Sequence, residues 1–445
     1  MLVDAIATAN DPQLAYLLSF EGVEGLELEQ NVRIVEEGER SHAHVGAEGL
    51  HRVSLSPLKP FRRFAAEIAG RPGSPLSAEI IERALAFSHL ASLLHLDAIV
   101  SPARQAFGPQ DAGLLRVPML TVPEALAVVG AHVRQRDEVP LGGTPPMTQS
   151  RTEVYPLTAR VIVPSGQEWW SSCVRYQGSE REEVLGLGEA VFKRLAQALR
   201  GRDGAHEALR RGDGRSAILD SLYHLDVVLT SSVASLDALA RLAHKVFDVE
   251  DSSFDAGWQR PKWIGRLRNK APSLADLITG RTKAQLDILT SMRNSIHAIP
   301  LDEFLYVERG GHSRTVEHRA MLSAELGTRI LSVGQDAGSP EDYGLFLSGP
   351  GTPYLNVGLF AERVLTWSIG IVGLLLAELL TFQQFPATGP PSFSRLDLRE
   401  REACAALAQV GQYPVRTDVS GIPARPSLHQ SVMGSLHRAQ QKVGQ

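Results

Sequence analysis

Apolar residues recur at helical spacing in three long stretches of the second half of the chain. In 216–249, leucines and valines return every three or four residues with no glycine or proline between them, which predicts one long helix with an apolar face. The same spacing predicts a helix over 274–297, which Pro300 ends, and another over 356–382. Three long helices with apolar faces indicate a helical bundle.

The first half of the chain alternates shorter helical and strand-like patterns. Ser77 is expected to cap a helix, and the apolar run 98–100 after it predicts a short strand. Residues 154–163 have the β-branched composition of a strand, and Pro156 places that strand at an edge or a bulge. A further helix is expected over 184–199. This alternation predicts an α/β domain.

Changes in glycine, proline and charge content divide the chain into four segments. We expect an α/β domain of unassigned role at 1–200, a charged, glycine-rich linker at 201–215 and a helical domain at 216–385. A proline-containing tail with one short helix follows at 386–445. Within the helical domain, 308–355 is rich in glycine and proline and predicts a loop insertion. The predicted fold class is α+β and mostly helical.

The composition is that of a soluble globular protein, with 43% hydrophobic and 21% charged residues. Lys and Arg number 45 against 50 Asp and Glu, a net charge of −5, which excludes a chain-wide basic field for nucleic acid but not a local basic patch. The two cysteines, Cys173 and Cys404, form no zinc-binding pair and indicate reduced thiols. The first 13 residues show no secretory leader, so we expect a cytoplasmic protein.

Two stretches imitate other kinds of site. Residues 364–380 approach the length of a membrane-spanning helix, but polar residues interrupt them and no basic cluster flanks them, so we expect a buried helix and no membrane. His42 and His44 would share one strand face, as two metal ligands must, yet their acidic surroundings favour a solvated strand end. Because the chain also contains no phosphate loop, dinucleotide fingerprint or zinc-protease motif, we expect no cofactor and no metal.

Candidate chemistry gathers near the end of the predicted 274–297 helix, in the run MRNSIH. Arg293 and His297 are four residues apart and project from one helix face. An imidazole can take a proton from a ribose 2′-hydroxyl or give one to a leaving oxygen, and a guanidinium can bind the phosphate between them. Asn294 can orient either group, and no metal is needed. The structural alternative is that Arg293 and His297 bond the last carbonyls of the helix and complement its dipole.

This Arg-Asn pair with a closely following His, on a late helix of a helical domain, resembles the HEPN superfamily. The resemblance covers about residues 214–385, and the flanking sequence is also similar to that of bacterial proteins carrying an RN-x-x-H helix. It implies an up-down bundle of four to five helices that dimerises, so that two R-x(4–6)-H motifs meet in one cleft and cleave RNA without a metal. A toxin or defence effector is the setting that it implies. The spacing here is R-x(3)-H, one residue shorter, which turns the histidine by about 100° around the helix.

A basic segment with interleaved tryptophans precedes this helix. Residues 258–270 read WQRPKWIGRLRNK and contain no acid. Basic side chains neutralise phosphates and aromatic faces stack unpaired bases, so we predict an RNA-binding loop. The alternative is a basic loop that docks on the acidic remainder of the protein. The predicted RNA-binding residues are Trp258, Arg260, Lys262, Trp263, Arg266, Arg268 and Lys270.

On the long 216–249 helix, His224 and Asp226 are candidate supporting partners of the motif, because a carboxylate beside an imidazole fixes its tautomer. Trp169 and Trp170 are expected in the core or at an interface, and His244 on the surface.

Two functions are therefore compatible with the sequence. The first is a cytosolic homodimer that binds RNA through its helical domain and, as the resemblance implies, cleaves it with Arg293, Asn294 and His297, under control of the N-terminal domain. The second is a non-enzymatic interaction module, in which Arg293 and His297 stabilise the bundle and the 356–382 helix forms a subunit interface. Attachment to a membrane through 364–380 would be a third.

Overall fold

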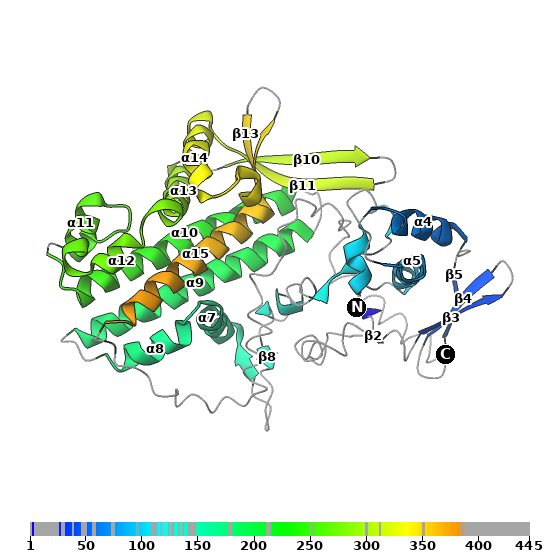
Figure 1. Ribbon diagram of the computed structural model, residues 1–445, viewed down its shortest axis with the longest axis horizontal. Helices are drawn as coiled ribbons and strands as arrows, with labels where there is room; N and C mark the ends of the chain where they lie inside the picture. Colours follow the sequence, from blue (N-terminus) through cyan, green and yellow to red (C-terminus); the bar gives the residue numbers. More distant parts are fainter. Residues whose placement is uncertain are drawn as a thin grey trace. The chain divides into compact units, whose positions relative to one another are not determined.

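The computed structural model is mostly helical with short strands, which confirms the predicted α+β, mostly helical class (Figure 1). The chain divides into two compact units: unit 1 contains 1–133 and 307–316, and unit 2 contains 134–306 and 317–385. The structure describes residues 2–3, 26–27, 32–37, 40–45, 51–55, 59–72, 76–94, 96, 98–107, 114–115, 117, 119–122, 125, 129–131, 134–135, 138–140, 148–176, 180–210, 215–250, 252–298, 301–310, 313–348, 352–382 and 385.

Unit 1 contains both short strands and helices among its described residues. The strands β2 (Leu26–Glu27), β1 (Leu2–Val3), β6 (Ile99–Val100) and β7 (Met119–Leu120) form a parallel sheet in that order. An antiparallel sheet contains β3 (Val32–Glu37), β4 (Arg40–Val45) and β5 (His51–Leu55). Helix α4 (Lys59–Ala69) packs on α5 (Ala78–Leu93). Ser77 caps α5 by accepting a hydrogen bond from the Ile80 amide, as predicted.

Unit 2 is built on long helices. The helices α9, α10 and α15 lie side by side, and α7 packs on α9 (Figure 1). The helices are α7 (Arg151–Ile162), α8 (Gly166–Val174), α9 (Arg181–Arg210), α10 (Arg215–Val246), α11 (Pro261–Lys270), α12 (Pro272–Asp276), α13 (Gly280–Ala298), α14 (Ala324–Ala337) and α15 (Val357–Leu379). The strands are β8 (Glu138–Pro140), β9 (Thr148–Ser150), β10 (Asp302–Gly310), β11 (Ser313–Met321), β12 (Leu345–Ser348) and β13 (Thr352–Asn356), the last four in the order β10-β11-β13-β12; residues 307–316 of β10 and β11 are counted with unit 1.

The predicted helices over 184–199, 216–249 and 356–382 are confirmed as α9, α10 and α15. The expected helix over 274–297 begins later, because Gly280 adopts a positive φ of 48° that separates α12 from α13. The expected loop insertion over 308–355 instead contains four strands and α14. The short helix predicted in 386–445 lies outside the described residues.

The strand predicted over 154–163 is wrong, because these residues belong to α7. Val154, Tyr155 and Ala159 are buried, and their spacing follows the helical period. Burial of that face outweighs the local preference of β-branched residues for strands and the cost of Pro156 inside the helix.

The linker predicted over 201–215 is also wrong for residues 201–210, which continue α9. Gly201 and Gly204 allow α10 to approach closely: a Cβ at Gly204 would lie 2.5 Å from the ring of His224. The boundary between the two units falls at 133/134 rather than near 200. A glycine-rich, charged pattern therefore marks a close helix–helix contact here.

α15 is the helix that the sequence identifies as close to membrane-spanning length. By length and composition it alone, among the described helices, is apolar enough to cross a membrane, and 72% of its most apolar window is buried inside the protein. It packs on α9, α10 and α12, and Asn356 caps it by accepting a hydrogen bond from the Leu359 amide at 3.0 Å. α15 is thus a largely buried helix, as predicted.

Candidate functional site

The predicted catalytic residues lie in the last turns of α13. Arg293 Nη1 donates a hydrogen bond to Asn294 Oδ1 at 2.9 Å. Arg293 Nε is buried and has no hydrogen-bond partner within the described part of the chain, so the guanidinium uses its donors incompletely there. His297 occupies α13 four residues later, and its side chain lies outside the described part of the structure.

Three arginines lie within electrostatic range of one carboxylate near this end of α13. Arg293, Arg241 of α10 and Arg260, which precedes α11, all lie close enough to Asp237 of α10 to lower its pKa, yet burial raises that pKa more, to a net value above the ordinary one. Asp237 makes no side-chain hydrogen bond or ion pair within the described residues. We call Asp237, Arg241, Arg260 and Arg293 the arginine cluster; it joins three segments of unit 2.

An exposed aromatic ring borders the arginine cluster. Phe254 is 74% exposed and lies in a short 3₁₀ helix, Ser253–Asp255. Ser252 caps this helix by accepting a hydrogen bond from the Phe254 amide at 3.3 Å. Arg260 Nη1 donates to the Phe254 carbonyl at 2.9 Å and to the Asp255 carboxylate at 3.0 Å. The Arg241 guanidinium carbon lies 5.4 Å from the centre of the Phe254 ring. Hydrogen bonds to the Phe254 backbone thus hold this turn, and the Phe254 ring lies in solvent near Arg241 and Arg260.

The tryptophans predicted to stack bases cannot do so, because both belong to the core. Trp258 is 4% exposed and Trp263 is 1% exposed, and their rings pack edge to face with centres 5.2 Å apart. Trp258 Nε1 donates to the Leu236 carbonyl at 2.8 Å, and Trp263 Nε1 donates to His244 Nδ1 at 3.3 Å. His244, expected on the surface, is therefore buried. Burial of these large rings outweighs the basic character of the sequence around them.

The basic side chains of the predicted RNA-binding loop lie on a helix, α11, and its approach. Arg268 Nε pairs with Asp276 at 3.1 Å, and Arg266 Nη1 donates to the Glu250 carbonyl at 3.3 Å. Lys262 and Lys270 are exposed. Solvent-exposed cations at these positions agree with a basic surface, and their contact with RNA stays a prediction.

The structure does not bring His224 and Asp226 to the motif. The His224 ring packs on Gly204, and the Asp226 carboxylate accepts a hydrogen bond from Thr230 Oγ1 at 3.1 Å. At 1.5 Å per residue, these two positions precede Asp237 by about 17 to 20 Å along α10. Trp169, by contrast, is fully buried, as predicted.

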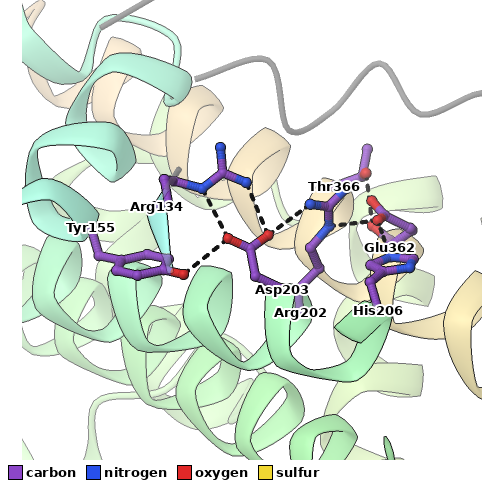
Figure 2. Close-up of polar contacts among 7 residues, drawn as sticks. All are labelled: Arg134, Tyr155, Arg202, Asp203, His206, Glu362 and Thr366. Atoms are coloured by element: carbon purple, nitrogen blue, oxygen red, sulfur yellow. Dashed lines mark hydrogen bonds and ion pairs between the residues drawn. The ribbon is translucent and has the colours of Figure 1, made fainter. Parts of the chain in front are cut away.

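A buried ion-pair network, which the sequence analysis did not predict, lies elsewhere in unit 2 (Figure 2). Arg134 donates from Nε and Nη2 to the two carboxylate oxygens of Asp203, both at 2.9 Å, and Arg202 Nη1 donates to Asp203 at 2.8 Å. Tyr155 donates its hydroxyl to Asp203 at 3.0 Å, and burial together with Asp203 raises the pKa of that hydroxyl. Both arginines are 1% exposed and Asp203 is fully buried.

The network continues from α9 to α15 through Glu362 (Figure 2). Arg202 Nε donates to Glu362 Oε1 at 2.5 Å, and His206 Nε2 hydrogen-bonds the same oxygen. Thr366 Oγ1 donates to the Glu362 carbonyl at 2.8 Å. The buried network therefore connects α7, α9 and α15 with the chain before β8.

Two arginines face two carboxylates in the buried network, and the His206 imidazole is a further partner of Glu362. Burial disfavours the charged form of Asp203, but Arg134 and Arg202 outweigh it and lower the pKa of Asp203 to about 2. Burial likewise opposes ionisation of Glu362, and Arg202 and His206 lower its pKa below the ordinary value. An acid in a largely apolar helix, Glu362, and an Arg-Asp pair between two glycines, Arg202 and Asp203, are the sequence signals that indicate such a network.

Comparisons with protein-family models, with curated proteins and with solved structures gave no match. The HEPN resemblance therefore depends on the motif and its helix alone. Among the described residues, no group of three or more His, Cys, Asp and Glu is arranged to hold a metal. His42 and His44 do lie two apart on one strand, β4, and their side chains are outside the described part.

Proposed function

We propose that the helical part of the protein binds RNA at the arginine cluster and cleaves it without a metal, as the HEPN resemblance implies. The gathering of three arginines around Asp237, with Arg293 of the motif among them, is the observation that supports this function. Arginine binds phosphate through two parallel donors, and Arg293 has a buried Nε without a partner.

In the proposed reaction each motif residue has one role. Arg293 binds the phosphate, and Asn294 positions its guanidinium through their 2.9 Å hydrogen bond. His297 accepts the proton of the ribose 2′-hydroxyl as the 2′-oxygen forms a bond to phosphorus, while the bond from phosphorus to the 5′-oxygen breaks and that oxygen takes up a proton. The products are a 2′,3′-cyclic phosphate and a 5′-hydroxyl. Homodimerisation through the helical unit and a cytoplasmic location belong to the same proposal.

The alternative is a non-enzymatic interaction module, and one observation favours it. Arg293 already donates to Asn294 and lies in the field of Asp237, as a residue that stabilises a helix end would. In that case Arg293 and His297 would affect stability rather than RNA.

Metal-free cleavage separates the two functions. The full chain is incubated with single-stranded RNA in EDTA, beside Arg293→Gln, His297→Ala and the control Arg329→Gln, which alters an exposed arginine of α14. We expect cleavage by the wild type and the control, cyclic phosphate ends, loss in both motif variants, and no cleavage of DNA of the same sequence, which lacks the 2′-hydroxyl. A folded wild type that leaves RNA intact, or motif variants that lose stability but no activity, would favour the interaction module.

Binding alone is measured separately by fluorescence anisotropy across a salt series. If Arg293 contacts a phosphate, Arg293→Gln reduces the slope of log affinity against log salt by about 1. Arg329→Gln leaves the slope unchanged.

A further inference from the structure

We propose that Phe254 is a stacking platform for one unpaired base of the nucleic acid that the arginine cluster binds. The platform rests on the proposed RNA binding and adds the class of ligand: a single strand with accessible bases rather than a duplex. Aromatic rings of RNA-binding proteins stack bases in this way, because every base has a π face.

The exposure of Phe254 is unlike that of the other aromatic residues near it. Trp258 and Trp263, four and nine residues later, are buried, whereas the Phe254 ring is 74% exposed. A solitary exposed apolar side chain is common on protein surfaces and is no site by itself. The surroundings of Phe254 supply the second, independent observation.

Those surroundings combine rigidity with positive charge. The Ser252 cap and the hydrogen bond from Arg260 to the Phe254 carbonyl fix the turn that carries the ring. Arg241 lies 5.4 Å from the ring centre, so one guanidinium is already adjacent to the ring. Arg241 and Arg260 also act on Asp237 together with Arg293. A phosphate at the cluster would thus place the neighbouring base beside Phe254.

The charge balance favours a polyanion over an acidic or neutral partner. Arg241, Arg260 and Arg293 act on Asp237, and among the described residues Arg260 alone of the three forms an ion pair, with Asp255. Burial raises the pKa of Asp237 above its ordinary value, so its charged form is disfavoured relative to that of an exposed carboxylate. An aromatic ring with uncompensated arginines is the combination that single-strand-binding proteins use.

The test compares strands with and without bases. Three probes of equal length are used: 2′-O-methyl RNA, which lacks the nucleophile and stays intact, its duplex, and an abasic phosphodiester strand. Affinity is measured for wild type, Phe254→Leu, Phe254→Trp, Arg293→Gln and the control Tyr223→Leu. Tyr223 is 65% exposed and lies about 21 Å from Asp237 along α10, so it matches Phe254 in type but not in place.

We expect the wild type to prefer the base-bearing single strand. Phe254→Leu weakens binding of that strand about tenfold and leaves the abasic strand and duplex within about twofold, since stacking on one aromatic ring has this size. Phe254→Trp retains the preference, and Tyr223→Leu changes nothing.

Two results would overturn the platform while the proposed RNA binding stands. One is wild-type affinity of Phe254→Leu for the base-bearing strand while Arg293→Gln binds weakly; the other is equal weakening of all three probes by Phe254→Leu. Absence of binding to every probe by the folded wild type would overturn the proposed function and the platform together.

Discussion

The arginine cluster and the buried network use the same side chains, arginine and carboxylate, with opposite results. In the buried network Arg134 and Arg202 make direct, charge-assisted bonds to Asp203 and Glu362, and the charges cancel. In the arginine cluster Asp237 has no direct partner among the described residues, and the positive charges exceed the negative ones. The charged groups of the buried network are paired with one another, whereas the arginine cluster has positive charge left to attract a ligand.

Whether a charged group is paired indicates better than its residue type whether it contributes to stability or to ligand binding. A buried ion set with satisfied donors costs several kcal/mol when one member is removed, because the remaining charges stay buried without compensation. A half-exposed, partly unsatisfied set loses little stability on substitution but changes what the surface attracts. The following predictions test this contrast.

The largest effect is expected for Asp203→Asn. It removes the carboxylate that Arg134 and Arg202 share and leaves two buried guanidinium groups facing a neutral amide. The free energy of unfolding, measured with urea, should fall by about 3 to 5 kcal/mol. Asp276→Asn breaks an exposed pair with Arg268 and should cost less than about 1 kcal/mol. Equal effects of the two variants would contradict a stabilising role of the buried network.

The free energy of unfolding should decrease at acidic pH because of Asp203 in the buried network. The pKa of Asp203 is about 2 in the folded protein and near its ordinary, higher value when unfolded, so the unfolded chain binds protons first on acidification. The stabilisation is complete above about pH 5 and is lost as the pH falls toward 2, by about 2 kcal/mol. Unfolding at several pH values measures it. In Asp203→Asn this part of the slope should disappear; an unchanged slope would place its origin elsewhere.

A smaller loss is expected for Gly204→Ala, which tests the contact between α9 and α10 beside the buried network. The new Cβ would lie 2.5 Å from the His224 ring, so the ring or the helix must shift, at about 1 to 2 kcal/mol. Gly186→Ala on the same helix meets no atom within 4 Å and should stabilise the protein by up to about 1 kcal/mol. Thermal unfolding of both variants decides whether Gly204 is a packing glycine; similar melting temperatures would show that it is not.

The sequence predicted the elements whose apolar period is long and uninterrupted, such as α10 and α15, and the Ser77 cap of α5. The prediction from sequence was wrong where the tertiary contacts of a residue could not be inferred from its residue type. By residue type, Gly204 is typical of a loop, but α10 packs on it. Arg202 and Asp203 are typical of solvated charges. In the structure they pair with Glu362 and with Arg134, and Arg134 is 68 residues or more away in sequence. Such pairings across the chain leave no local pattern.

The candidate site divides in the same way. Helical spacing places Arg293 beside Asn294 on α13, and Arg260 from another segment acts on the same carboxylate, Asp237, as Arg293; their roles in RNA binding and cleavage stay predictions. The sequence predicts base stacking by Trp258 and Trp263, whose size draws them into the core, and indicates no such role for Phe254, whose ring is exposed. Sequence identifies an aromatic residue near basic ones, but only packing decides which of them faces solvent.

The smallest expected effect on stability, and the sharpest on the comparison, is that of Asp237→Asn. The carboxylate is partly desolvated and has no direct partner among the described residues, so the neutral amide should change the free energy of unfolding by no more than about 0.5 kcal/mol, in the stabilising direction. Because burial raises the folded-state pKa of Asp237 above its ordinary unfolded-state value, the gain of this variant should be complete above the raised pKa, shrink as the pH falls between the two values, and vanish below the ordinary one. It also removes one negative charge from the arginine cluster, so it should bind the base-bearing strand more tightly than the wild type, by a few-fold at low salt and less at high salt.

Asp203→Asn and Asp237→Asn are the same substitution at two places where a carboxylate lies among arginines. Opposite signs of their effects on the free energy of unfolding in urea would establish that Asp203 has a structural role and that Asp237 regulates the charge offered to a ligand. Two losses of similar size would contradict that division.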